Sequence, residues 1–416
     1  MSGRKKRKGE TLRMTIRTMM VSMGAAFVVL SARSEGESYP VPEAVPELMT
    51  ASDGSAVTSR ETWEKVRRPE IVRLLCEQEY GVRPVERPSD LTFAEIAAPE
   101  TCFGGKAIRK RVRATYSGPY GKGTMDFSVW IPKADHPVAA FVHSSPRPAE
   151  TADDPTAPRK VYLLPAEYIV SRGYAVAAYC NQDVAADWKG PDVATNGVFL
   201  AYGPKDLSKR GPSEWGILSA WAWGMSRVLD WMETEPLIDA KRVGAVGLSR
   251  NGKTALVAGA FDSRFAMTVS CCSGCSGAKL NHMANWESES IKAIMIAKKW
   301  FCPNYEQYVG HDRDGKMAFD QHFLLALVAP RLLYVSSASE DAWAGQRGEF
   351  AAAQLASPAW GLYGRNGLVE HGFPKPDTPC LAGSVGYHLR TGVHDITRYD
   401  WQCYLDFADR HDWNLR

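Results

Sequence analysis

The stretch that most constrains the fold is Val243–Thr254, which reads VGAVGLSRNGKT. It opens with a short apolar run, as a buried strand does, and then breaks at a serine among glycines. Helix-forming residues with a helical apolar spacing continue it to Phe261. A serine at a sharp strand-to-helix turn is typical of a nucleophile elbow, where free N–H groups at the helix start face the reacting oxygen. The motif is one residue longer than G-x-S-x-G, so a simple βα turn with a capping serine is the alternative.

The rest of the chain alternates predicted strands with predicted helices, which favours a mostly parallel central sheet flanked by helices. Two segments alternate apolar and polar residues, as half-buried antiparallel strands do, and four are short apolar runs. One helix has an apolar face formed by Ile217, Trp221, Met225, Val228 and Met232. The expected strands are Ala107–Tyr116, Thr124–Trp130, Ala139–His143, Tyr174–Cys180, Met267–Ser270 and Leu332–Ser337, and the expected helices are Arg67–Tyr80, Gly216–Glu233 and Asp400–His411.

The N-terminus has the pattern of a targeting segment. Basic residues precede the apolar stretch Met19–Ala32, which is too short for a comfortable membrane span. We therefore expect residues 1–35 to be a signal peptide, or alternatively an N-terminal anchor, with residues 36–60 as a linker and residues 61–416 as one catalytic domain. The protein would then be secreted or periplasmic, without stable membrane insertion once the signal is cleaved, and disulfides are permitted there.

Composition narrows the range of partners. A net charge of +3 over 416 residues, without a basic face beyond the N-terminus, makes nucleic acid an unexpected partner. Cys272-Ser-Gly-Cys275 is a C-x-x-C pair, but no second pair follows with ligand spacing, so we expect neither a metal nor a cofactor. We expect a monomer.

A serine nucleophile needs a histidine base and a carboxylate that orients it. Glu340 and Asp341 follow the predicted strand Leu332–Ser337, and His394 lies in a polar loop before the last predicted helix. The order nucleophile, acid, histidine is that of the α/β-hydrolases. Acidic residues in loops are more often simply exposed to solvent, which is the alternative to a catalytic role. Asp341 is the first candidate for the acid and Glu340 the second.

The run Gly247-Leu-Ser249-Arg250-Asn-Gly-Lys253 resembles the G-C-S-R-x-G-K signature of the glucuronoyl esterases, carbohydrate esterase family 15. The resemblance extends from about Glu61 to the C-terminus and implies an α/β-hydrolase fold with three layers. Further stretches resemble the bacterial branch of the family: 273–277, 300–302, 320–331, 338–343, 386–390 and 400–401.

The resemblance implies a serine esterase that cleaves the ester between 4-O-methyl-D-glucuronic acid of glucuronoxylan and a lignin alcohol. Ser249 would attack the carbonyl, and His394, oriented by Asp341, would take and return the proton. Arg250 would place a positive charge and its backbone N–H at the oxyanion. The alternatives are another carbohydrate esterase, for acetyl or cinnamoyl groups, or a hydrolase-like binding protein without turnover.

The resemblance also assigns contacts with the uronate hydroxyls to Lys253, Glu289 and Trp343, with Glu287 as an alternative to Glu289. Two departures from the family stand out. Leu248 replaces the usual Cys or His, and Ser270–Ser273 lacks the carboxylate that some members carry after this strand.

A final expectation concerns two cysteines in family-like motifs. A disulfide between Cys275 and Cys302 would close a loop of about 27 residues and contribute roughly 3–4 kcal/mol in the chain-entropy model.

Overall fold

Residues 45–156, 163–187, 197–204, 206–283, 288–310 and 317–414 are described by the computed structural model. They all belong to one unit that runs from Val41 to Arg416. The predicted targeting segment, residues 1–35, lies outside the described residues. Among the helices that are described, none is long and apolar enough to cross a membrane.

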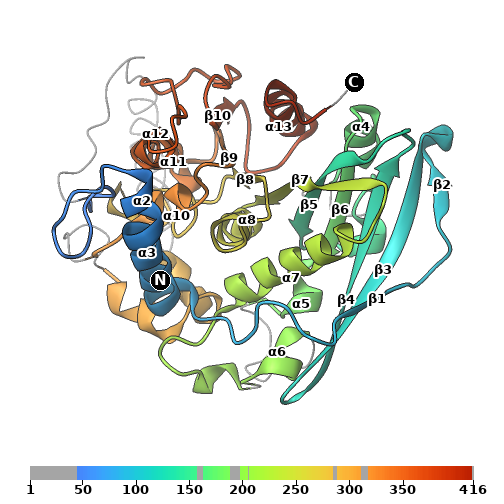
Figure 1. Cartoon of the computed structure of the whole chain (residues 1–416), viewed down its shortest axis with the longest axis horizontal. Coiled ribbons are helices and arrows are strands. Elements are labelled where there is room, and N and C mark those ends of the chain that lie inside the picture. Colours follow the sequence, from blue (N-terminus) through green and yellow to red (C-terminus); the bar gives the residue numbers. More distant parts are fainter. Residues whose placement is uncertain are drawn as a thin grey trace, which may run out of the picture. The chain divides into compact units, whose positions relative to one another are not determined.

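A ten-stranded sheet forms the centre of this unit, in the order β1-β3-β4-β6-β5-β7-β8-β9-β10, with β2 pairing on β3 (Figure 1). The strands are β1 Thr92–Glu95, β2 Glu100–Cys102, β3 Ala107–Gly118, β4 Gly121–Pro132, β5 Val138–Ser145, β6 Ala175–Cys180, β7 Ile238–Leu248, β8 Met267–Cys271, β9 Leu332–Ala338 and β10 Val385–Arg390. The strand before Ser249 and the six other strands expected from the sequence are all present. The short strands β1 and β2 and the strand β10 were not predicted.

The pairing divides the sheet into two parts. Strands β1 to β4 pair antiparallel with one another, and β4 pairs antiparallel with β6. From β6 through β5, β7, β8 and β9 to β10 every neighbour is parallel. The carboxyl ends of β7, β8, β9 and β10 therefore meet at one edge of the sheet, where α/β proteins place their sites.

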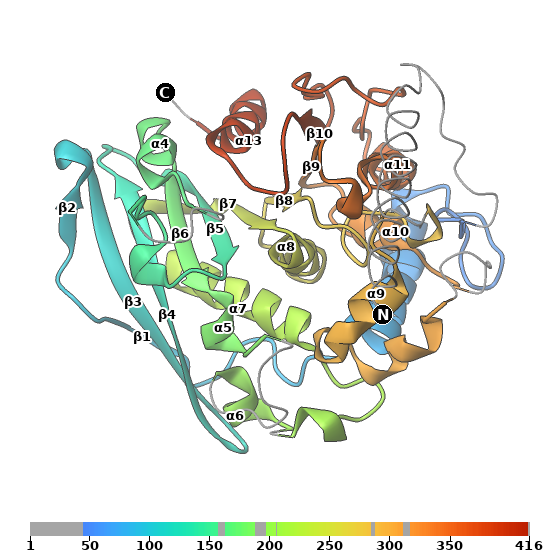
Figure 2. The same cartoon turned by 180° about the vertical axis from the view of Figure 1, so that it is seen from behind.

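Helices cover both faces of the sheet, which gives the three layers expected (Figures 1 and 2). The helices α7, α8, α10 and α11 pack on one face within a large hydrophobic cluster, and α4 and α13 pack on the other. The α-helices are α2 Arg60–Thr62, α3 Arg68–Leu75, α4 Ala166–Ser171, α5 Asn181–Val184, α6 Val198–Tyr202, α7 Ile217–Met232, α8 Arg250–Phe261, α9 Ile291–Ile294, α10 Gln321–Ala326, α11 Gln346–Ala356, α12 Pro358–Gly361 and α13 Arg398–Arg410.

Two helices differ from their predictions. The helix expected from Arg67 begins earlier: α2 and α3 are joined by a π-helical turn at Trp63–Arg67, and another π-helical turn extends α3 to Tyr80. Helix α7 is buried on all sides, including its polar residues, whereas the sequence indicated a single buried face. It is covered because α8 and the segments around α5 and Trp300 pack around it.

Part of the segment expected to be a linker contributes to the core. Leu48, Ala51 and Val57 are buried in the same hydrophobic cluster as α7 and α8. Arg67 helps to hold this segment, because its guanidinium donates hydrogen bonds to the carbonyls of Glu47 and Leu48.

The predicted disulfide is wrong, because none of the nine cysteines, all of which lie in the described part of the chain, forms a disulfide. Cys275 and Cys302 are both buried, and each thiol lies against an oxygen of its own surroundings. Cys275 Sγ is 3.1 Å from Oδ1 of Asn281, and Cys302 Sγ is 3.6 Å from the carbonyl of Glu77. The position of both cysteines in family-like motifs did not bring the two sulfurs together.

Candidate active site

The turn from β7 to α8 has the strand–turn–helix geometry that the motif predicts. Ser249 has φ 61° and ψ −128°, a conformation that costs a non-glycine residue free energy and is found at functional sites. The backbone closes so tightly that a Cβ on Gly247 would lie 2.0 Å from the carbonyl oxygen of Asn251. The Ser249 side chain caps no N–H of α8, so the alternative of a capping serine does not hold.

The backbone around Ser249 is anchored on the neighbouring strand. Its N–H donates to the carbonyl of Cys271, the last residue of β8, over 2.8 Å. The side chain is half-buried at the carboxyl edge of the sheet. Because β8 pairs with β7 along its whole length, this bond fixes the serine relative to the next strand end.

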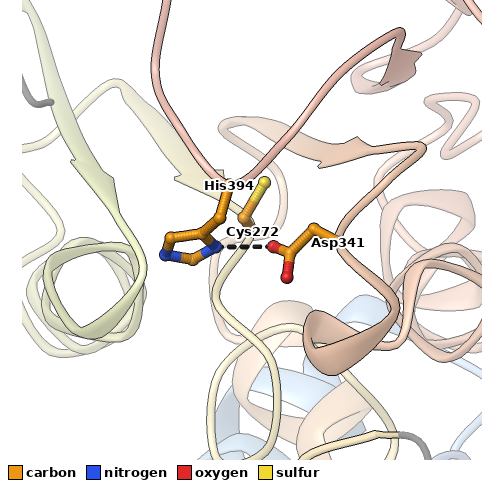
Figure 3. A group of neighbouring side chains, drawn as sticks. All are labelled: Cys272, Asp341 and His394. Carbon is orange, nitrogen blue, oxygen red and sulfur yellow. Dashed lines mark hydrogen bonds and ion pairs between the residues drawn. The ribbon is translucent and has the colours of Figure 1, made fainter.

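Asp341 and His394 come together from the loops that follow β9 and β10 (Figure 3). Nδ1 of His394 lies 2.5 Å from Oδ2 of Asp341. The Asp341 side chain is 5 % exposed and that of His394 is 37 % exposed, so a buried carboxylate holds an accessible imidazole. Glu340, the second candidate for the acid, is exposed. The geometry therefore favours Asp341 over Glu340 as the acid that orients His394.

Cys272 stands beside this pair at the end of β8 (Figure 3). Its sulfur and the nearest donor atoms of Asp341 and His394 all lie within 4.8 Å of one another. These residue types can bind metals, but here Asp341 and His394 already bond to each other. A hydrogen bond with Cys271 and burial raise the pKa of the Cys272 thiol well above its usual value. The thiol therefore stays neutral beside the histidine.

Arg250, the first residue of α8, is held by two residues that the sequence analysis did not assign to the site. Its guanidinium forms an ion pair with Asp187, and its Cζ lies 5.2 Å from the ring centre of Trp300. The indole N–H of Trp300 donates to the other oxygen of Asp187 over 2.9 Å. An arginine predicted in a pocket calls for a carboxylate partner, but nothing in the sequence indicated which one.

The three predicted sugar contacts also lie together. Nζ of Lys253 is 2.8 Å from Oε2 of Glu289, and it donates to the carbonyl of Ser273 as well. The Glu289 N–H donates to the carbonyl of Trp343 over 2.8 Å. Lys253 is 2 % exposed, whereas Trp343 is 53 % exposed. Glu287, the alternative to Glu289, lies outside the described residues.

The fold and the site define a class of protein. A sharp serine turn follows β7, and a hydrogen-bonded Asp–His pair follows β9 and β10, in the chain order serine, acid, histidine. This arrangement at the carboxyl edge of a largely parallel sheet is that of the α/β-hydrolases.

Comparison with known proteins identifies the family within this class. Residues 148–364 match the family described as "Glucuronyl esterase, fungi". The chain is 35 % identical to a carbohydrate esterase from an unknown prokaryotic organism over 396 residues, which cover 88 % of this chain and 89 % of that one. It is 30 % identical to the 4-O-methyl-glucuronoyl methylesterase of Schizophyllum commune, over 79 % of this chain and 76 % of the relative.

The solved structures agree with these matches. The glucuronoyl esterase from Solibacter usitatus is similar with a TM-score of 0.80 and 34 % identity, over 90 % of this chain and 99 % of that one. The chain belongs to the glucuronoyl esterases, carbohydrate esterase family 15, which are carboxylic ester hydrolases.

Proposed function

We propose that the protein hydrolyses the ester between 4-O-methyl-D-glucuronic acid of glucuronoxylan and lignin alcohols. The observation that supports this substrate is the ion pair between Glu289 and Lys253, which lies on α8, the helix that begins directly after Ser249. An ammonium donor and a carboxylate acceptor side by side suit the hydroxyls of a sugar ring. A simple acyl group would offer them nothing to bind.

The reaction proceeds through an acyl-enzyme on Ser249. His394 takes the proton of the serine hydroxyl as the oxygen attacks the C6 carbonyl, and returns it to the leaving alcohol. Water then attacks the acyl-enzyme with the same histidine as base. Asp341 holds Nδ1 of His394 and stabilises the imidazolium that forms in each half of the reaction.

Arg250 stabilises the oxyanion. Its backbone N–H belongs to the free N–H groups at the start of α8, and its guanidinium adds a fixed positive charge. Asp187 and Trp300 hold that charge in one place, which is what preorganised stabilisation of a transition state requires.

The sugar ring binds beside the nucleophile. Lys253 lies four residues after Ser249, which places it one helical turn further along α8. Trp343 exposes its indole on the loop that also carries Asp341, where it can cover one side of a uronate ring.

Export fits this substrate, because xylan and lignin lie outside the cell. We infer that residues 1–35 direct the chain to a secreted or periplasmic location, and that the catalytic domain includes residues 48–57 of the segment expected to be a linker. The basic and apolar pattern of the first 35 residues supports this inference.

An assay on two substrates tests the proposed function. Purified protein should release alcohol from benzyl glucuronate faster than it releases acetate from an acetylated sugar, and Ser249→Ala should remove the activity while far-UV circular dichroism stays unchanged. Preference for the acetylated sugar would mean another carbohydrate esterase. Activity of Ser249→Ala close to that of the wild type would overturn the nucleophile.

A further inference from the structure

A buried carboxyl outside the proposed catalytic set joins two of the loops that carry the site. Glu349 lies in the first turns of α11 and has no exposed surface. Its Oε1 accepts the N–H of Gly274 over 3.0 Å and faces the hydroxyl of Ser273 at 3.4 Å. Its Oε2 accepts the hydroxyl of Ser337, in β9, over 2.6 Å. One carboxyl group therefore connects the residues after β8 with the end of β9.

The residues after β8, Cys272–Gly274, form the wall of the proposed sugar subsite, and we call them the β8 exit loop. The carbonyl of Ser273 accepts a hydrogen bond from Nζ of Lys253. Gly274 approaches Glu289 so closely that a Cβ on it would lie 2.6 Å from Oε2 of Glu289. A shift of this loop would thus displace both partners of the Lys253–Glu289 pair.

Backbone hydrogen bonds also hold this loop, because the Cys272 N–H donates to the carbonyl of Ser336 and the Lys279 N–H donates to the carbonyl of Gly274, but the acceptor of the Gly274 N–H is Glu349. Cys272 and Gly274 both have positive φ, at 44° and 65°, which is unfavourable for a cysteine. The Gly274 N–H is a buried donor, and such donors require an acceptor. Glu349 supplies it from a helix, and helices position groups more rigidly than loops do.

We propose that Glu349 is a positioning residue of the sugar subsite, whose carboxyl braces the β8 exit loop against β9 and so fixes Lys253 opposite Glu289. The inference rests on the proposed function, because it assigns the effect of the brace to recognition of the uronate ring. The hydrogen bonds of Glu349 go to Gly274, Ser273 and Ser337 and to none of Ser249, Asp341 and His394, although the negative charge of Asp341 is near enough to help raise the pKa of Glu349.

Burial is consistent with a bridging carboxylic acid here. It raises the pKa of Glu349 to about 7, against the hydrogen bonds from Ser337 and Gly274. Below that pH the group is a neutral acid: Oε1 still accepts the Gly274 N–H, whereas a protonated Oε2 donates to the Ser337 oxygen, which reverses the direction of that bond. Glutamine has the same length and the same donor–acceptor pattern, whereas aspartate keeps the acid but is one methylene shorter.

The test is the ratio of kcat/KM on benzyl glucuronate to kcat/KM on p-nitrophenyl acetate, measured at pH 6. The ratio does not depend on how much of a variant is folded. Glu349→Asp cannot reach both Gly274 and Ser337, so the ratio should fall about tenfold, since displacements of about 1 Å at a site have effects up to about a hundredfold. Glu349→Gln should restore the ratio to within about threefold of the wild type.

Glu235→Asp is the matched control. Glu235 is also buried and accepts a side-chain and a backbone N–H, from Lys110 and Leu237, but it lies before the start of β7, at the edge opposite to Ser249. The ratio of the two kcat/KM values in Glu235→Asp should equal that of the wild type.

An unchanged ratio in Glu349→Asp, or equal losses on both substrates, overturns the proposal. If Glu349→Asp does not fold, Ser337→Ala removes one end of the same bridge, and an unchanged ratio there has the same meaning. A wild-type enzyme inactive on benzyl glucuronate would instead refute the proposed function.

Discussion

The Arg250 guanidinium forms an ion pair with Asp187, a residue 63 positions earlier in the chain. Trp300 completes the arrangement from a third segment, since its N–H binds the same carboxylate and its ring lies beside the guanidinium. Three segments therefore fix one charge next to the serine turn. Without these partners the long Arg250 side chain would be flexible, and ordering it at an oxyanion would cost conformational entropy.

Loss of Asp187 should lower the rate of the chemical step. In Asp187→Ala, Arg250 keeps its charge but loses its fixed position, and removing an oxyanion donor altogether typically costs about 100- to 1,000-fold. We expect kcat to fall about 10- to 100-fold on both benzyl glucuronate and p-nitrophenyl acetate, with a smaller change in KM. Asp126→Ala, which breaks the exposed Arg113–Asp126 pair between β3 and β4, is the control. A kcat within twofold of the wild type would show that Arg250 needs no such support.

The two acidic residues after β9 should differ sharply. Asp341→Asn replaces a carboxylate that accepts from His394 by an amide, which favours the wrong histidine tautomer, and kcat should fall by about 1,000-fold or more. Glu340→Gln changes an exposed side chain and should alter kcat by less than about threefold. Steady-state kinetics on p-nitrophenyl acetate measures both. If the Glu340 variant were the weaker enzyme, the acid would be misassigned.

The stability of the protein should depend on pH through two buried glutamates. Burial raises the pKa of Glu79 and of Glu349 to about 7. The folded protein therefore keeps protons that the unfolded chain releases near pH 4.5, so this stabilisation is complete below about 4.5 and is lost as the pH rises through about 7. Each group contributes on the order of 3 kcal/mol at most.

Urea unfolding at pH 5 and pH 8 measures this dependence. Glu79→Gln has no proton to lose, so its free energy of unfolding should fall less between the two pH values than that of the wild type. Comparing each variant with the wild type cancels the opposite contributions of His143 and His322, whose pKa values burial lowers to about 4. Identical pH dependences for variant and wild type would contradict the prediction.

The sequence predicted the sheet core and the serine turn well because both depend on local patterns. Short apolar runs become buried strands where helices cover both faces of a sheet, and the glycines near Ser249 allow the backbone to turn tightly. Asp341 could be predicted because it follows a predicted strand, and His394 because it lies in a polar loop before the last predicted helix, in a known chain order. The parallel strands then bring them to one edge of the sheet.

Long-range contacts of polar side chains could not be predicted in this way. Nothing around Asp187 marks it as the partner of Arg250, and nothing around Glu349 marks it as the partner of Gly274. The prediction of a Cys275–Cys302 disulfide was wrong for the same reason, because the position of two residues in sequence motifs does not determine the distance between them in the fold. The burial of α7 on all sides also depends on segments distant in sequence. Its polar residues therefore indicated an exposed face that the structure does not have.

The assignment of the substrate depends most directly on Lys253 and Trp343. Lys253→Ala removes a charged donor beside the nucleophile, a hydrogen bond worth about 1.5–3 kcal/mol if it binds a uronate hydroxyl. That corresponds to a loss of roughly 10- to 150-fold in kcat/KM on benzyl glucuronate. Trp343→Ala should act in the same direction, because its exposed indole can donate to a sugar oxygen. p-Nitrophenyl acetate has no ring hydroxyls, so its hydrolysis should barely change in either variant. Equal losses on both esters would mean that these residues support the serine turn, and the enzyme would then be an esterase that does not read the uronate through them.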